Sequence, residues 1–320
     1  MSAVESPGGA GSKLRADAVL LAVAVVWGSS FVVVRRALDT APPFGLLFWR
    51  FGVGLALAAA AVAIRRRGSP AGLLRDGTVL GTILAAGMSL QVLGQAETTA
   101  TNAAFLTGLA VVLTPFVAVF RTGRLPTLEN GLGIALASVG FLLLTYPGGG
   151  AAFRRGDLWV AACGLVFAFY GVELAERAGK HDALWLTVVQ LSFVVALAAA
   201  LALLFRSASL SGTHAGSLEA RPIAWSGGFA GSILYLGSLG TLAAFIGWTW
   251  SQGRMSAIHG AIILALEPVV ASLLAAWFLG ERPGRRGVAG AALVLAGIVV
   301  SELRLRRKSP DESKPPKAAY

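Results

Sequence analysis

Long apolar segments follow one another along nearly the whole chain, separated by short polar or basic connections. Each is close to the roughly 20 apolar residues that a helix needs to cross a bilayer. Polar and apolar residues do not alternate within these segments, as they would in a membrane barrel. Because lipid offers no hydrogen-bond partner to an open backbone, we expect helices. The ten predicted spans are residues 18–34, 42–64, 78–96, 101–120, 130–146, 158–175, 183–205, 225–250, 257–279 and 287–303.

Two stretches of the chain, 101–145 and 256–301, resemble each other. Each joins a helix with an internal proline, Pro115 or Pro268, through a short Gly/Arg/Pro hinge to a glycine-containing helix. Each half of the chain carries five spans, and an odd number means that the second copy enters the membrane upside down. Such inverted repeats are typical of secondary transporters, whose substrate site lies near the midplane. Further matching positions are Pro126, Gly133 and Gly140 with Pro283, Gly290 and Gly297.

The predicted fold class is therefore an all-α integral membrane protein, with ten transmembrane helices in two inverted five-helix repeats. We assign residues 1–16 to a cytoplasmic N-terminal tail, 17–146 to the first repeat and 157–303 to the second. Residues 304–320 are rich in Pro and Lys, which indicates a disordered cytoplasmic C-terminal tail. The Gly/Ser-rich connection 207–222 is expected to be a flexible loop on the opposite side of the membrane.

Composition and charge agree with a membrane protein. Hydrophobic residues make up 56% of the chain and charged residues 13%, about half the share of a soluble domain. The net charge of +11 comes from short clusters between apolar runs, a pattern that does not suit nucleic-acid binding. Most of the 27 lysines and arginines fall on the side of the termini, which predicts both termini in the cytoplasm and a location in the cell membrane.

Enzymatic chemistry and bound cofactors are not expected. The single cysteine, Cys163, excludes a disulfide within the chain, and the sequence has no set of metal ligands. It also has no phosphate-binding loop and no catalytic triad. The expected partners are a small-molecule substrate, the lipid bilayer and, for a coupled carrier, protons.

Two charged residues lie deep within predicted spans, where charges are usually functional. Glu267 is about 15 Å into its span. It could couple protons or bind a substrate amine, or it could cap a helix broken at the neighbouring Pro268. Arg50 is roughly 12 Å into its span. It could bind an anionic substrate, pair with a carboxylate, or extend toward the membrane surface.

Other candidates have two interpretations each. Pro115 and Pro268 either free a backbone carbonyl toward a cavity or only kink their helices. Glu173 either takes part in transport or forms an interfacial pair with Arg177. Trp27 and Trp248 either stack on a substrate or anchor helices at the interface. The uncharged candidates, which either line a polar path or join helices, are Gln91, Gln95, Asn102, Thr107, Gln190 and Gln252.

These features resemble the EamA-type family of the drug/metabolite transporter superfamily, from Ala18 to Glu302. The resemblance rests on Trp27-Gly28-Ser29-Ser30-Phe31, Pro42-Pro43, Phe48-Trp49-Arg50-Phe51, Leu266-Glu267-Pro268 and Leu279-Gly280-Glu281-Arg282. It implies a 5+5 inverted arrangement, a central cavity, and export or exchange of small metabolites. The first repeat departs from the pattern, because it has Gly123-Arg124-Leu125 without the acidic residue.

The resulting prediction is a secondary active exporter of small metabolites or drug-like compounds across the cytoplasmic membrane. It would work by alternating access, with or without proton coupling. An importer or exchanger of an anionic metabolite is the alternative, and a scaffold or sensor that transports nothing is a third. The sequence leaves the substrate, the direction of transport and the oligomeric state open.

Overall fold

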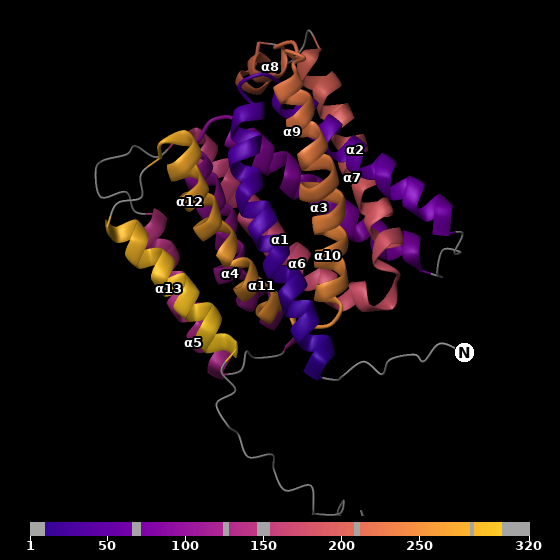
Figure 1. Ribbon diagram of the computed structural model, residues 1–320. Helices are drawn as coiled ribbons and strands as arrows, with labels where there is room; N and C mark the ends of the chain where they lie inside the picture. Colours follow the sequence, from indigo (N-terminus) through magenta and orange to yellow (C-terminus); the bar gives the residue numbers. More distant parts are fainter. Residues whose placement is uncertain are drawn as a thin grey trace, which may run out of the picture.

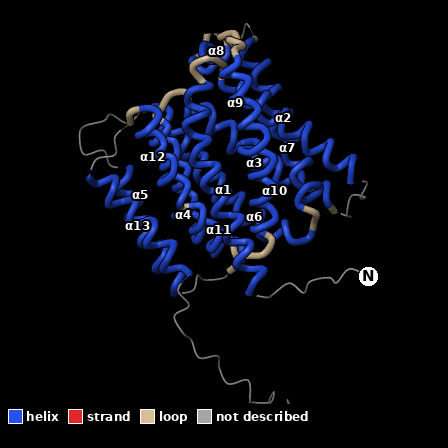
Figure 2. Tube along the Cα trace, in the orientation of Figure 1, coloured by secondary structure: helices blue, strands red, loops and turns tan. Residues whose placement is uncertain are grey.

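The computed structural model describes residues 10–65, 72–123, 128–145, 154–207, 212–281 and 285–302. Within these residues the regular structure is entirely helical (Figures 1 and 2). The first-half helices are α1 (Ala10–Ala37), α2 (Pro43–Arg65), α3 (Leu73–Gln95), α4 (Ala100–Thr122) and α5 (Leu128–Thr145). The second-half helices are α6 (Arg155–Arg177), α7 (Ala183–Arg206), α8 (His214–Glu219), α9 (Gly227–Gly237), α10 (Ala244–Gln252), α11 (Ala257–Leu264), α12 (Leu266–Leu279) and α13 (Arg285–Glu302).

Eight helical segments in the described residues are long and apolar enough to cross a membrane. They match eight predicted spans, with α9 joined to α10 and α11 joined to α12. Helices α5 and α13 stand where the fifth and tenth spans were predicted, and the count of ten stays a prediction. Helix α1 begins at Ala10, within the segment assigned to the N-terminal tail. The predicted tail 304–320 lies outside the described residues.

The two halves of the chain are packed into each other. The main contacts between helices distant in sequence are α3 on α6 and α7, α4 on α6, α2 on α7, α1 on α12, and α5 on α13. We call the end of the bundle that carries α8 the α8 end, and the end at which α1 begins the Ala10 end (Figure 1). Because each of these contacts joins one half to the other, any opening of the bundle must separate the halves locally.

Helices α5 and α13 lie side by side at one edge of the bundle (Figure 1). A Cβ added at Gly140 would lie 2.6 Å from the carbonyl oxygen of Gly290, and one at Gly297 would lie 2.6 Å from that of Gly133. Small residues let helices approach this closely without a side chain between them. These four glycines match in pairs between the two similar stretches of sequence, Gly133 with Gly290 and Gly140 with Gly297, and in space each lies against the opposite member of the other pair.

Two segments that cross the bundle depart from a regular α-helix. A π-helical turn, Ser238–Ala243, separates α9 from α10. The chain also turns at Ala265, between α11 and α12. Pro268 accounts for that break, because it has no N–H to donate to the carbonyl one turn earlier. Helix α4, in contrast, continues through Pro115.

The connection between α7 and α9 is more ordered than expected in its described part. Glu219, at the end of α8, is 0% exposed. Its carboxylate accepts hydrogen bonds from the backbone N–H groups of Phe44 and Gly45, at 2.9 and 3.1 Å. Burial raises the pKa of the Glu219 carboxyl, and the two N–H groups oppose that shift. The prediction of a flexible loop is therefore wrong for residues 212–222, because a buried carboxylate attaches α8 to the first turn of α2.

Candidate functional site

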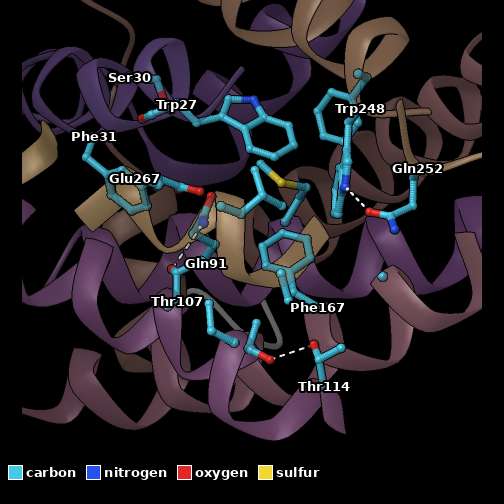
Figure 3. Close-up of a pocket in the computed structure, with 18 of the residues that line it drawn as sticks. Trp27, Ser30, Phe31, Gln91, Thr107, Thr114, Phe167, Trp248, Gln252 and Glu267 are labelled. Atoms are coloured by element: carbon cyan, nitrogen blue, oxygen red, sulfur yellow. Dashed lines mark hydrogen bonds between the residues drawn. The ribbon is translucent and has the colours of Figure 1, made fainter. Parts of the chain in front are cut away.

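A cavity of about 80 Å³ lies at the centre of the bundle, between the two halves of the chain (Figure 3). This volume has room for several water molecules. Its walls come from α1 to α4 of the first half and from α6, α10, α11 and α12 of the second. The predicted site residues that line it are Trp27, Arg50, Gln91, Thr107, Trp248, Gln252 and Glu267.

Glu267 occupies the first turn of α12, directly after the break at Ala265. Its carboxylate points into the cavity (Figure 3). No hydrogen bond to this carboxylate is formed by any other described residue, so the structure does not support the interpretation of Glu267 as a helix cap. Gly28 lets α1 approach the backbone of α12 at Glu267, since a Cβ at Gly28 would lie 2.7 Å from the Glu267 carbonyl oxygen.

Arg50 is held by the π-helical turn. Its Nε donates to the Thr241 hydroxyl at 3.1 Å and its Nη2 to the Gly240 carbonyl at 3.2 Å. The same carbonyl accepts a hydrogen bond from Trp27 Nε1 at 3.0 Å. Arg50 is 5% exposed, so it does not extend to the membrane surface. A guanidinium has five N–H donors, and the rest of this set remains available at the cavity, where Arg50 and Glu267 attract each other electrostatically.

Aromatic rings form much of one wall. The ring of Trp27 lies 4.9 Å from that of Trp248 in an edge-to-face arrangement and 5.3 Å from that of Phe245. Trp248 Nε1 donates to Gln252 Oε1 at 3.1 Å. Both tryptophans therefore belong to the cavity wall.

The other uncharged candidates lie in different parts of the bundle. Gln91 and Thr107 face each other in the cavity wall, with 3.2 Å between Nε2 and Oγ1. Gln190 accepts a hydrogen bond from the Tyr170 hydroxyl and joins α6 to α7. Gln95 borders a smaller void beside Arg50. The remaining candidates, Asn102, Pro115 and Pro268, are outside the cavity lining.

Glu173 lies at the Ala10 end of the bundle, away from the central cavity. Arg121 Nε at the end of α4 donates to its carboxylate at 2.7 Å, and Arg177 also pairs with it. Arg177 Nε is 3.4 Å from an oxygen of Asp76 on α3. This confirms the predicted pair with Arg177. It also shows a network between the halves, here called the Glu173 clamp, that the sequence did not reveal.

A matching arrangement at the α8 end centres on Glu281. Its carboxylate accepts hydrogen bonds from the backbone N–H groups of Ala100 and Thr101, at 3.2 and 3.1 Å, and from the Thr101 hydroxyl. We call this the Glu281 clamp. The residue belongs to the Leu279-Gly280-Glu281-Arg282 motif, so its family pattern was visible in the sequence while its partner was not.

Apolar clusters lie on both sides of the cavity along the bundle. The Ala103 cluster, toward the α8 end, contains residues of α1, α4, α6 and α12, including Phe31, Val160 and Ala271. The Val117 cluster, toward the Ala10 end, contains residues of α4, α6 and α11, including Ile258. Both clusters use α4, on either side of the cavity residues 107–114. The arrangement is that of a central cavity with an apolar cluster toward each end and a carboxylate clamp at each end of the bundle.

The fold and this site define a multi-pass helical membrane protein with a central cavity. The model of the EamA-like transporter family matches the chain twice, over residues 14–146 and 154–303. The chain therefore belongs to the EamA-like transporter family, as its motifs indicated.

Named relatives cover nearly the whole chain. An uncharacterized transporter of Archaeoglobus fulgidus is 28% identical over 95% of this chain and 92% of its own length. A probable terminal-alkyne amino-acid exporter of Streptantibioticus cattleyicolor is 27% identical over 92% of this chain and 96% of its own. A solved crystal structure superposes with a TM-score of 0.66 at 21% identity, covering 90% of this chain and 96% of the other; this likeness shows the fold alone.

Proposed function

We propose that this protein is a secondary active exporter of small zwitterionic metabolites, and that amino acids with apolar side chains are its substrate class. In this proposal the chain forms ten transmembrane helices in two inverted repeats, residues 17–146 and 157–303. Both termini lie in the cytoplasm, and the protein resides in the cell membrane. Alternating access about the interface between the repeats moves the substrate, and the protein is a transporter and not an enzyme.

The observation that carries the proposal is the pair of opposite charges at the central cavity. The Glu267 carboxylate has no hydrogen-bond donor among the described residues, and the Arg50 guanidinium has donors to spare. An amino acid can place its ammonium group at the first and its carboxylate at the second. The aromatic walls then suit the apolar remainder of the substrate, as is usual for small-molecule sites.

The relatives support both the direction and the substrate class. Among the curated relatives, one is named a probable exporter of an amino acid with a terminal alkyne, a zwitterion with an apolar side chain. Among the described residues that line the cavity, Arg50 is the only cation. A strongly anionic substrate would need several cations, so an importer or exchanger of anions is not favoured.

In this proposal the same carboxylate also couples transport to protons. The Glu267 carboxylate can bind either a proton or the substrate ammonium, because the protonated carboxyl no longer has the negative charge that attracts an ammonium ion. Protonation from the acidic side of the membrane would therefore release the substrate, and loss of the proton on the other side would allow a new substrate to bind. This exchange needs no further cofactor.

The test is counterflow in liposomes that contain the purified protein. Amino acids, simple amines and carboxylic acids are compared as internal substrates against labelled L-norleucine. Preferential exchange with amino acids is expected, together with uptake driven by a pH gradient. Glu267→Gln should abolish the gradient-driven uptake and reduce counterflow about tenfold, because a neutral amide does not balance an ammonium ion. Exchange with carboxylic acids alone, or gradient-driven uptake that survives the substitution, would overturn the proposal.

A further inference from the structure

The central cavity has a polar end and an apolar end. Glu267 lies on one side of the view in Figure 3, and Thr114 and Gln252 lie on the other. Thr114 Oγ1 already donates to the Ala110 carbonyl at 2.6 Å. The side-chain oxygen of Gln252 accepts from Trp248, and its Nε2 donates to the Ser256 carbonyl at 3.1 Å. Each of these polar groups already has a partner within the protein, so this end makes less demand for a polar substrate group than the Glu267 carboxylate does.

Small residues form part of the wall at this end, beside larger ones such as Phe167 and Trp248. Ala110 comes from α4, Gly171 from α6, and Ala257 and Ala261 from α11. The wall that α4 contributes runs from Thr107 to Thr114, about 10 Å at 1.5 Å per residue. Small side chains on three helices leave room for a chain of a substrate that enters from the charged end.

Close packing against a neighbouring helix does not explain why position 171 in this wall is a glycine. Elsewhere on α6, a Cβ at Gly156 would lie 2.4 Å from the Gly94 carbonyl oxygen, and one at Gly164 would lie 2.6 Å from that of Leu106. Those two glycines are needed because neighbouring helices touch the α6 backbone. A Cβ at Gly171 would meet nothing within 4 Å. Glycine is a poor helix former, and here its missing side chain leaves open space in the cavity.

We propose that the small-residue end of the cavity, bounded by Ala110, Gly171, Ala257 and Ala261, is the slot for the substrate's apolar side chain, and that Gly171 determines the size of side chain accepted. The substrates are amino acids with long apolar side chains, held by their charged groups at Glu267 and Arg50. This inference rests on the proposed function and adds to it the part of the substrate that decides selectivity.

The experiment compares counterflow of labelled L-norleucine and L-alanine for the wild type, Gly171→Ala and Gly171→Val. Valine at this position should reduce exchange of norleucine at least tenfold relative to alanine, since one methylene in an apolar pocket changes selectivity by roughly 10- to 200-fold. Gly171→Ala should give a smaller change in the same direction. The matched control is Gly52→Val, because a Cβ at Gly52 also meets nothing within 4 Å while Gly52 is outside the cavity lining.

The outcomes separate the slot from the function on which it rests. A selective loss of norleucine in the Gly171 variants, absent from Gly52→Val, supports the slot. Equal loss of both substrates, or no change in their ratio, overturns the slot and leaves the proposed function standing. A wild type that exchanges neither amino acid overturns both. Intrinsic tryptophan fluorescence of each variant checks folding, and the smaller Gly171→Ala substitution keeps the test decisive if the valine variant does not fold.

Discussion

Replacing Glu281 by alanine removes one of the two clamps between the halves and should open the α8 end of the bundle. The carboxylate accepts three hydrogen bonds from the first turn of α4, two from backbone N–H groups and one from a hydroxyl. Hydrogen bonds to a charged group contribute about 1.5–3 kcal/mol each, and loss of a helix cap costs about 0.5–2 kcal/mol. Glu281 is partly exposed, and Thr99 still caps α4 through the Asn102 N–H. We therefore expect a loss of about 2 kcal/mol.

This free energy is lost only from states in which the α8 end is closed. A change of about 2 kcal/mol corresponds to a shift of roughly 30-fold in the equilibrium between closed and open forms. The single cysteine of the chain reports on that equilibrium. Cys163 is 0% exposed and lies on α6 beside Thr107 of the cavity wall. A membrane-impermeant maleimide can reach it only when the bundle opens.

The assay is the rate of maleimide labelling of Cys163 in oriented vesicles, with the reagent added to one side at a time. Glu281→Ala should speed labelling about 30-fold from the α8 side and leave the rate from the other side unchanged. Arg35→Ala is the matched control, because it breaks an exposed pair at the same end of the bundle, between Arg35 on α1 and Asp39 just beyond the end of that helix. Cys163→Ser removes the signal. An unchanged rate in Glu281→Ala would refute the clamp, and equal acceleration from both sides would show general loosening instead.

Three further predictions use the same protein. Glu173→Ala releases Arg121 at the Ala10 end and should speed Cys163 labelling about tenfold from that side only; acceleration from the α8 side would contradict the assignment. Burial raises the pKa of Glu219, so the folded state binds a proton at this carboxyl more tightly than the unfolded state does. The stability that this proton contributes is complete below the usual glutamate pKa of about 4.3 and is lost as pH rises through the folded-state pKa. The melting temperature of the wild type should accordingly fall relative to that of Glu219→Gln as pH rises from about 4 to about 7, and a constant difference would argue against it. Gly140→Ala brings a Cβ within 2.6 Å of the Gly290 carbonyl oxygen and should lower stability by about 1–3 kcal/mol in detergent unfolding, whereas Gly131→Ala on the same helix meets open space; equal effects would show that the α5–α13 contact adapts.

The sequence predicts the helices well because hydrophobic thickness decides where they cross. Eight of the predicted spans recur as segments of membrane length, and the two charges found deep within spans, Glu267 and Arg50, both line the cavity. A charge inside an apolar run is a strong signal, because lipid tolerates it only beside a partner or a wet cavity.

Uncharged polar residues give a weaker signal. Gln91 lines the cavity while Gln190 joins α6 to α7, although both were selected for the same reason. Helix-to-helix hydrogen bonds and cavity walls use the same residue types, so only the position on the folded helix separates them. The π-helical turn that holds Arg50 could not be predicted from the hydropathy of the sequence, because it is a change in backbone conformation and not in composition.

Contacts between the halves were not predictable for a related reason. Glu281 and Glu219 both bind the first turn of a helix from the other half of the chain. Their partners are backbone N–H groups, which every residue except proline has, so the sequence around α2 and α4 gives no sign of them. The glycine pairs of α5 and α13 were visible as a repeat, while their direct contact in space was not.

Helix α4 links these observations to the proposed alternating access. Its first turn is held by Glu281 and its last turn by Glu173, through Arg121, and both carboxylates belong to the second half of the chain. At 23 residues it is about 35 Å long, and it runs through Pro115 without a break. The facing segment is broken at Ala265, so that α12 packs in the Ala103 cluster and α11 in the Val117 cluster. In the alternating access that we propose, a helix that tilts away from one clamp would be pressed toward the other, while the break at Ala265 would let each cluster separate by itself. Opening at one end would then favour closure at the other, which is the condition that a carrier must meet to move its substrate without leaking.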